Sequence, residues 1–235
     1  MKQIKQPQHY QFKNKFRMKK LFLALVILLT SSIPNAQVQV SKEPRHKNVL
    51  ENKYIRLLDV KIQPGDTSLF HIHSTPSVFV HFTNTVVCSQ IKGREWVTAK
   101  NTQGNAWYRS FVNDTLVHRV SNCDTVPFNV TDVELLSPYK PTMKLQPLPF
   151  TLLFENEKVI AYRLTAAAFN KQVIKKRGPM IAQIVAGSEV TLHNKKGKEL
   201  SQLKAGKYVY IKPRTAFYFS ATGNEEINLI LFEIK

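Results

Sequence analysis

The chain has 235 residues, of which 43% are hydrophobic and 10% aromatic, and its formal net charge is +18 at pH 7. The basic residues are scattered, with only short clusters such as 175–177 and 195–196, which is typical of a solvated basic surface. We therefore expect no nucleic-acid partner, although a strongly basic chain would otherwise indicate one.

The first 36 residues are predicted to be a basic leader and a signal peptide. Residues 18–20 (Met-Lys-Lys) precede an apolar run at 21–29, and the segment closes on small residues that end at Ala36. An apolar run of this length is far shorter than the roughly 20 residues of a membrane-spanning helix, so we expect cleavage near Ala36 and no stable membrane anchor. The long polar stretch before Met18 indicates that translation starts at Met18. The mature protein is thus expected to be periplasmic or secreted.

The remaining chain is predicted to be all-β. It keeps 27 Lys and Arg against 16 acidic residues, a net charge of +11, and its length suits one large domain or two small ones. Short runs rich in Val, Ile, Phe, Tyr and Thr alternate with turn residues such as Pro64-Gly65. No long segment shows a capped 3.6-residue period, so helices should be few.

Two histidines stand in an early extended segment. His71 and His73 are two residues apart, and because side chains alternate along a strand, both imidazoles point to the same face. A third imidazole from a distant strand, that of His118, could close a facial metal site. Three imidazoles that leave a coordination position open allow a metal to activate water or polarise a substrate carbonyl.

These segments resemble the two sequence motifs of the cupin superfamily. The first motif is a Gly, five residues and His-x-His, here Gly65, His71 and His73; the second is His-x-x-x-Asn, here His118 and Asn122. The resemblance implies a cupin-like β-barrel (double-stranded β-helix, or jelly roll) with the three His facing inward, and a structural turn role for Asn122. It also implies one divalent transition metal, Fe, Ni, Cu, Zn or Mn, which the ligand types do not distinguish.

The family pattern is incomplete in this chain. The family has a Glu ligand four or five residues after the second His, where this chain has Ser77 and Val78. The Pro and Gly usual before the later His are replaced by Asn113 and Thr115. Without the carboxylate the ligands carry no negative charge, which weakens Mn relative to softer metals. A three-His metal site and the packed remnant of a lost site are both left open.

Other residues could complete the site. His81 lies four residues after Ser77 and shares its face, so it points inward only if Ser77 does. Glu95 could enter only from a neighbouring strand, and His46 and His193 have no partner by spacing and are predicted to be surface residues. Aromatic side chains on the flanking strands pack the core or line a pocket for a small apolar ligand. They are Phe70, Phe79, Phe82, Trp107, Tyr108 and Phe111, and Phe79 is the first candidate for the pocket if Ser77 points inward.

Two cysteines, Cys88 and Cys123, remain after the leader. In an oxidising compartment such a pair can form a disulfide. The sequence does not show whether the two thiols meet in space, so a bond and two buried free thiols both stay open.

The chain also contains an internal repeat. Residues 49–57 are echoed by residues 153–164, about 100 residues later, which is a whole-domain period. The second half lacks a ligand set, because the positions that match the three His hold approximately Ile174, Lys176 and Tyr218. This predicts a bicupin: a cupin-like barrel with the candidate metal site at 37–136, a Pro-rich linker at 137–149, and a degenerate cupin-like barrel at 150–235.

Three functional hypotheses follow from the resemblance. Oxygenase chemistry is the most frequent precedent among metal cupins, which implies an exported oxygenase or related metalloenzyme with a small-molecule substrate. A non-catalytic periplasmic bicupin that captures a small molecule or metal is the alternative, and a protein that acts through pairing into a homodimer is the third. No nucleotide-binding loop, Ser nucleophile elbow or CxxC motif occurs in the sequence, so phosphoryl transfer, serine hydrolysis and thioredoxin-like roles have no support.

Overall fold

The computed structural model describes residues 37–141, 145–165, 169, 172–221, 223 and 226–235. The predicted leader and signal peptide, residues 1–36, lie outside the described residues. Within the described part of the chain, no helix is long and apolar enough to cross a membrane.

The described residues are almost entirely strands and connecting turns. In the first half the elements are β1 (Val38–Gln39), the 3-10 turn η1 (Val40–Lys42), β2 (His46–Glu51), β3 (Ile55–Ile62), β4 (His71–His73), β5 (Ser77–His81), β6 (Thr85–Ile91), β7 (Trp96–Asn101), β8 (Ala106–Arg109), β9 (Leu116–Asn122) and β10 (Phe128–Leu135). In the second half they are β11 (Thr151–Glu155), β12 (Val159–Leu164), β13 (Met180–Ala186), β14 (Val190–Asn194), β15 (Glu199–Leu203), β16 (Tyr208–Ile211), β17 (Phe217–Ala221) and β18 (Asn228–Ile234). The all-β prediction is confirmed.

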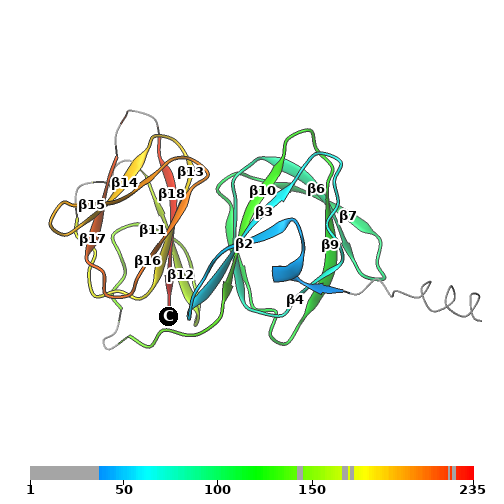
Figure 1. The fold of residues 1–235 in the computed structure, drawn as a ribbon, viewed down its shortest axis with the longest axis horizontal. Coiled ribbons are helices and arrows are strands. Elements are labelled where there is room, and N and C mark those ends of the chain that lie inside the picture. Colours follow the sequence, from blue (N-terminus) through cyan, green and yellow to red (C-terminus); the bar gives the residue numbers. More distant parts are fainter. Residues whose placement is uncertain (1–36, 142–144, 166–168, 170–171, 222, 224–225) are drawn as a thin grey trace, which may run out of the picture. The chain divides into compact units, whose positions relative to one another are not determined.

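The strands form two barrels (Figure 1). The first barrel is built from a sheet of order β1-β4-β9-β6-β7 and a sheet of order β2-β3-β10-β5-β8. The second has a sheet of order β11-β12-β18-β13-β16 and a three-stranded sheet of order β15-β14-β17. β10 ends at Leu135 and β11 begins at Thr151, so the Pro-rich stretch runs between a strand of each barrel.

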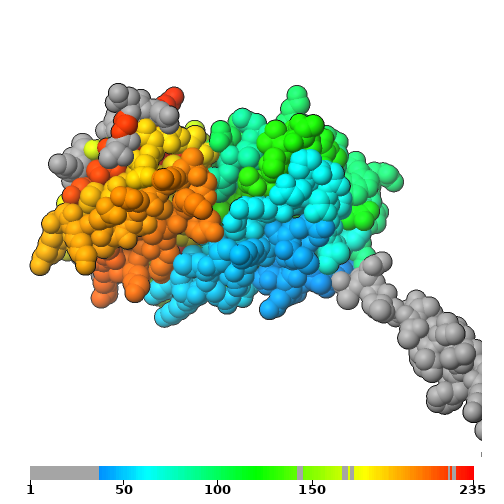
Figure 2. All heavy atoms as spheres, turned by 45° about the horizontal axis from the view of Figure 1, so that its top comes forward, coloured from blue at the N-terminus to red at the C-terminus, as the bar shows by residue number. Residues whose placement is uncertain are grey.

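The two barrels share a sheet-on-sheet core. Along β5, Ser77, Phe79 and His81 turn to the inside of the first barrel, while the alternate residues Val78 and Val80 belong to a core cluster that also contains second-barrel residues. Both faces of β5 are therefore covered, and all five of its residues are buried. In the space-filling view the two halves lie directly against each other (Figure 2). The second barrel contributes Val159, Ala161, Ile181, Val185, Ile230, Phe232 and Ile234 to this cluster.

The internal repeat appears as matching hydrogen bonds. Before β3, the Asn52 side-chain oxygen accepts from the backbone N–H of Tyr54 at 2.9 Å. Before β12, the Asn156 side-chain oxygen accepts from the backbone N–H of Lys158 at 2.8 Å. The echoed Glu-Asn pair thus builds the same turn between β2 and β3 as between β11 and β12, because an Asn side chain readily bonds to the backbone two residues on.

Cys88 and Cys123 form a disulfide, with their Cα atoms 5.9 Å apart. Cys88 lies on β6 and Cys123 directly follows β9, its sheet neighbour. Of the two alternatives that the sequence left open, the structure therefore has the bond.

Candidate metal centre

The three predicted histidines come together on two adjacent strands. His71 and His73 lie on β4, which pairs antiparallel with β9 so that His71 stands opposite His118. The ligand nitrogens of the three rings all lie within 4.8 Å of one another. His71 and His73 are 0% and 3% exposed, and His118 is partly buried. The period-two argument from the sequence thus placed both β4 imidazoles correctly on the inner face.

The loop before β4 is fixed by the turn that follows β9. Gly65 has a φ of 75°, a left-handed conformation that suits a residue without Cβ, and its N–H donates to the carbonyl oxygen of Asn122 at 3.0 Å. The Asn122 side-chain amide donates to the carbonyl oxygens of Ile62 and Val126, each at 2.9 Å. Asn122 therefore holds a turn and does not point at the three imidazoles, as the sequence predicts.

The Nε2 atoms of the three rings face inward. His73 Nε2 lies 3.1 Å from His118 Nε2, and His71 Nε2 is buried without a hydrogen-bond partner among the described residues. Burying such a nitrogen unpaired is unfavourable, so it marks a place where the protein lacks a partner of its own. Three converging imidazole nitrogens fit a transition-metal ion.

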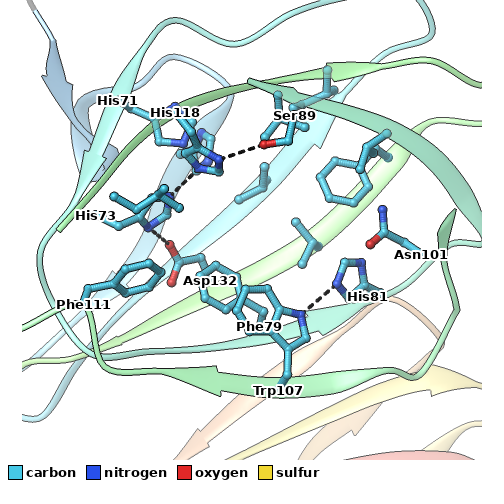
Figure 3. A pocket seen from close by; sticks show the side chains of 18 residues that line it. His71, His73, Phe79, His81, Ser89, Asn101, Trp107, Phe111, His118 and Asp132 are labelled. Atoms are coloured by element: carbon cyan, nitrogen blue, oxygen red, sulfur yellow. Dashed lines mark hydrogen bonds and ion pairs between the residues drawn. The ribbon is translucent and has the colours of Figure 1, made fainter. Parts of the chain in front are cut away.

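The Nδ1 atom of each ring has a different neighbour outside the centre. His71 Nδ1 donates to the carbonyl oxygen of Leu69 at 2.9 Å, which leaves its Nε2 lone pair free. His118 Nδ1 lies 3.2 Å from Ser89 Oγ, and His73 Nδ1 lies 3.5 Å from Asp132 Oδ2 (Figure 3). A carbonyl, a hydroxyl and a carboxylate are the outer groups that orient metal-binding imidazoles in proteins.

Asp132 is the site residue that the sequence analysis missed. It lies on β10 opposite Phe79, is 1% exposed, and neither of its carboxylate oxygens has a hydrogen bond among the described residues. Burial, with the nearby charge of Glu134, raises the pKa of Asp132 to about 8. No clear signal in the sequence marks it, because β10 also carries Asn129, Thr131 and Glu134, and an acidic residue does not stand out in such a strand.

Burial keeps the three imidazoles neutral. It lowers the pKa of His71 to about 4 and that of His118 to about 3, and the repulsion of neighbouring imidazoles adds to the effect. The pKa of His73 is lowered further, again mainly by burial. Neutral imidazole is the form that binds metal, so the three rings are in the competent state at neutral pH.

Phe111 forms one wall of the centre. Its ring stacks on His73 with the centroids 4.9 Å apart and an interplanar angle of 22°. The backbone of Phe111 has a φ of 56°, in the left-handed region that bulky residues rarely adopt. Such backbone strain clusters at functional sites, where the surrounding structure holds the residue in place.

Of the two further histidines predicted to be surface residues, His46 is buried and His193 is partly exposed. His46 is only 7% exposed, because its Nδ1 lies 2.6 Å from Glu43 Oε2 and its ring lies 4.6 Å from that of His71. His193 is partly buried in the second barrel, where its Nε2 lies 2.8 Å from Ser220 Oγ. Spacing could not reveal either partner.

The alternative ligands that the sequence raised do not join the three His. Ser77 is buried on the inner face, and its hydroxyl donates to the Thr75 carbonyl oxygen at 3.2 Å, while Val78 faces the other barrel. Because Ser77 points inward, His81 does too, but it bonds to Trp107 instead. Glu95 is exposed and does not line the pocket.

The three histidines open onto a pocket inside the first barrel, with a cavity volume of about 260 Å³. Its walls are mostly apolar and aromatic, and among the described residues none of the side chains that line it is Lys or Arg. Of the aromatic residues singled out from the sequence, Phe79, Trp107 and Phe111 line it, whereas Phe82 and Tyr108 pack against the core between the barrels.

The matching place in the second barrel is filled by apolar side chains. Ile174 pairs with Phe217 there, as His71 pairs with His118, so the counterpart of His118 is Phe217 and not Tyr218 as predicted. Met180 stands opposite Glu233 as Ser77 stands opposite Glu134, and this register makes Leu231 the counterpart of Asp132. Ile174, Phe217 and Leu231 all belong to the core of the second barrel.

The fold was compared with solved structures, after the sequence matched no family model and no curated protein. A Cupin 2 conserved barrel domain protein from Leptotrichia buccalis is 12% identical, with a TM-score of 0.51 over 80% of this chain and 88% of its own. The protein Ylba from E. coli is 11% identical, with a TM-score of 0.56 over 82% and 85%. The oxalate decarboxylase of Lactobacillus farciminis, solved as a formate complex, is 11% identical, with a TM-score of 0.50 over 77% of each chain.

These neighbours extend over both barrels, because each match covers more than three quarters of this chain. The matched architecture, the inward His-x-His strand and the paired strand that carries the third His agree with the motifs read from the sequence. The chain thus has the cupin fold, with two cupin-like barrels in tandem, similar to these solved structures.

Proposed function

We propose that the first barrel is a mononuclear three-His metal site that acts on a small organic molecule, as a metalloenzyme of the oxygenase type. The observation that carries this proposal is the convergence of three Nε2 atoms while each Nδ1 has an outer neighbour. A packed remnant would not need three oriented rings around an unpaired buried nitrogen. In this site a divalent metal would supply a Lewis acid with coordination positions free for substrate.

Asp132 is the acid–base candidate. It lines the pocket and lies beside Nδ1 of His73, on the ring edge away from Nε2. With a metal bound, a carboxylate at that place would accept the Nδ1 proton, fix the tautomer and leave the Nε2 lone pair for the metal. A bound cation would favour the ionised carboxylate, which burial alone disfavours.

The pocket favours an uncharged, largely apolar substrate. None of the described side chains that line it is a fixed cation, and Arg109 lies over the ring of Phe111, so a small dianion would depend chiefly on the metal to balance its charge. The aromatic walls around Phe79, Trp107 and Phe111 instead suit a planar or hydrophobic molecule. We infer that the substrates differ from the oxalate named for the L. farciminis neighbour.

We also propose that the protein is exported. The supporting observations are the signal-peptide pattern of residues 1–36 and the disulfide between Cys88 and Cys123, because such bonds persist in oxidising compartments.

Ligand capture without turnover is the second candidate function. It is favoured by the position of Asp132, which lies beside the outer nitrogen of His73 and not among the three Nε2 atoms. A site with neutral ligands alone can hold a metal and a small molecule without an acid–base group next to the open position.

Cobalt binding and oxygen uptake test the two candidates in sequence. Co²⁺ added to the untagged, metal-free protein should give the visible absorption of a nitrogen-ligated ion at one equivalent, and His73→Ala should lose it. His193→Ala, which alters an imidazole of the second barrel, should keep it and serves as the matched control. The iron-loaded protein should then consume oxygen with a panel of phenols and aryl ketones. Co²⁺ binding without uptake would favour capture, and no Co²⁺ binding would contradict the metal site itself.

A further inference from the structure

A second group of polar atoms lies in the pocket, on the side away from the three histidines. His81 ends β5, Asn101 ends β7 and Trp107 lies on β8, and all three line the cavity. Figure 3 shows His81, Asn101 and Trp107 on one side and His71, His73 and His118 on the other. The metal site proposed above uses none of these three residues.

The hydrogen bond from Trp107 fixes the tautomer of His81. Trp107 Nε1 lies 3.1 Å from His81 Nε2, and because an indole N–H can only donate, the Nε2 atom must accept. The proton of the neutral ring is therefore on Nδ1. That Nδ1–H is buried without a partner among the described residues, in a side chain that is 4% exposed.

Asn101 adds a second donor. Its Nδ2 atom is also buried without a partner among the described residues. Buried donors are nearly always paired in folded proteins, so two unpaired ones that line the same cavity indicate a partner from outside the chain. Both groups donate, so that partner must bring an acceptor.

Aromatic rings connect this group to the metal centre. Phe79 stacks on Trp107 with centroids 4.2 Å apart and an interplanar angle of 17°, and it meets His73 edge-on at 5.9 Å. Phe128 lies 5.8 Å from the ring of His81 on the same side as the donors. A flat apolar body therefore has continuous aromatic wall to lie against between the two polar ends.

We propose that His81 and Asn101 form a second binding pole, which donates hydrogen bonds to a carbonyl oxygen of a planar, aromatic ligand whose other end reaches the three histidines. The part played by the histidines rests on the function proposed above, whereas the pole itself does not depend on a metal. The pole selects a neutral carbonyl over a carboxylate, because both donors are uncharged and the surrounding walls are apolar. Burial also lowers the pKa of His81 to about 4, so the ring stays neutral around pH 7.

Acetophenone and α-methylstyrene test this pole, since they have nearly the same shape and differ in a carbonyl oxygen against a CH₂ group. Their affinities for the untagged, metal-free full chain are measured by ligand-observed NMR titration. His81→Phe keeps an aromatic ring and removes the Nδ1–H donor. It should weaken acetophenone about tenfold, the usual loss for one hydrogen bond, and should leave α-methylstyrene unchanged or bound more tightly.

Asn101→Leu is the second variant, in case His81→Phe disturbs the Trp107 contact, and it should weaken acetophenone in the same selective way. His193→Phe, the same substitution at a partly buried His of the second barrel, should change neither affinity. Equal losses for both probes in His81→Phe and Asn101→Leu, or no binding of acetophenone to the unaltered protein at millimolar concentration, would overturn the proposal.

The metal content of His81→Phe separates this proposal from the proposed function. The variant should take up as much Co²⁺ as the unaltered protein, because His81 is not among the converging nitrogens. Loss of carbonyl selectivity with full metal uptake supports the pole. Carbonyl selectivity in a protein that takes up no metal would keep the pole and contradict the metalloenzyme.

Discussion

The two barrels share a scaffold and differ in what fills it. Each has an Asn-built turn between two of its early strands. The pairing of β5 with β10 in the first barrel has the same register as that of β13 with β18 in the second, with Ser77 opposite Glu134 and Met180 opposite Glu233. The first barrel then holds imidazoles and a carboxylate around a cavity, where the second holds a packed apolar core. Since the fold forms without these polar groups, their burial in the first barrel is best explained by a function that needs them.

Giving the second barrel the buried acid of the first should cause the largest loss of stability. Leu231→Asp places a carboxylate at the counterpart of Asp132, within the apolar core cluster of the second barrel. We expect a loss of about 4 kcal/mol in the free energy of unfolding at pH 7, because the carboxylate is buried without a partner. Urea unfolding measures it. A loss below about 1 kcal/mol would show that the second barrel tolerates buried polar groups as the first barrel does.

Removing the disulfide should lower the stability of the first barrel. The described cysteines both lie in the first barrel, and the double variant Cys88→Ser/Cys123→Ser should lower the unfolding free energy by about 3 kcal/mol, by widening the unfolded ensemble. Trp96 and Trp107 both lie in the first barrel, so their fluorescence reports on it during unfolding. An unchanged urea midpoint would argue against the bond.

Acid should destabilise the first barrel through its buried imidazoles, and His81 is the cleanest to test. Its pKa in the fold is about 4, below the ordinary 6.5, so between these values the unfolded chain binds a proton that the folded chain does not. Stability should therefore fall as the pH drops from 6.5 towards 4. For His81 alone the loss between pH 8 and pH 5 is about 2 kcal/mol. His81→Phe should remove that part of the pH dependence, and an identical profile for the variant would contradict the pKa assignment.

Asp132→Leu should give the smallest change and the most specific one. It installs the residue of the second barrel, and because the carboxylate lacks hydrogen bonds, we expect the unfolding free energy to rise by about 1 kcal/mol. Metal affinity should fall about tenfold, since His73 loses the group beside its Nδ1. Thermal unfolding and Co²⁺ titration measure the two effects. A variant that is both less stable and unchanged in affinity would show that Asp132 serves the fold.

Local patterns in the sequence predicted much of this molecule. His71 and His73 share a face by strand periodicity, Gly65 permits the turn before them, and the repeated Glu-Asn pair marks an equivalent turn in each barrel. Each of these signals depends on residues close together in the chain, and for that reason it could be read without a structure.

The other features of the site depend on contacts between residues far apart in the chain, which the sequence alone does not show. Asp132 reaches the site because β10 pairs with β5, a contact between residues about 50 positions apart. His46 is buried through Glu43 and His71, and no spacing rule joins those three. The expected counterpart Tyr218 was wrong by one residue, and on a strand a shift of one residue moves the side chain to the other face, so the inward residue is Phe217.

Elemental mass spectrometry tests the central claim most directly. The untagged protein and the variant His71→Ala/His73→Ala/His118→Ala are each incubated with Fe, Mn, Ni, Cu and Zn salts, desalted and analysed for metal per chain. We predict close to one equivalent in the unaltered protein and none in the variant. No metal in either protein would contradict the metal centre and leave the three imidazoles as the remnant of a lost site.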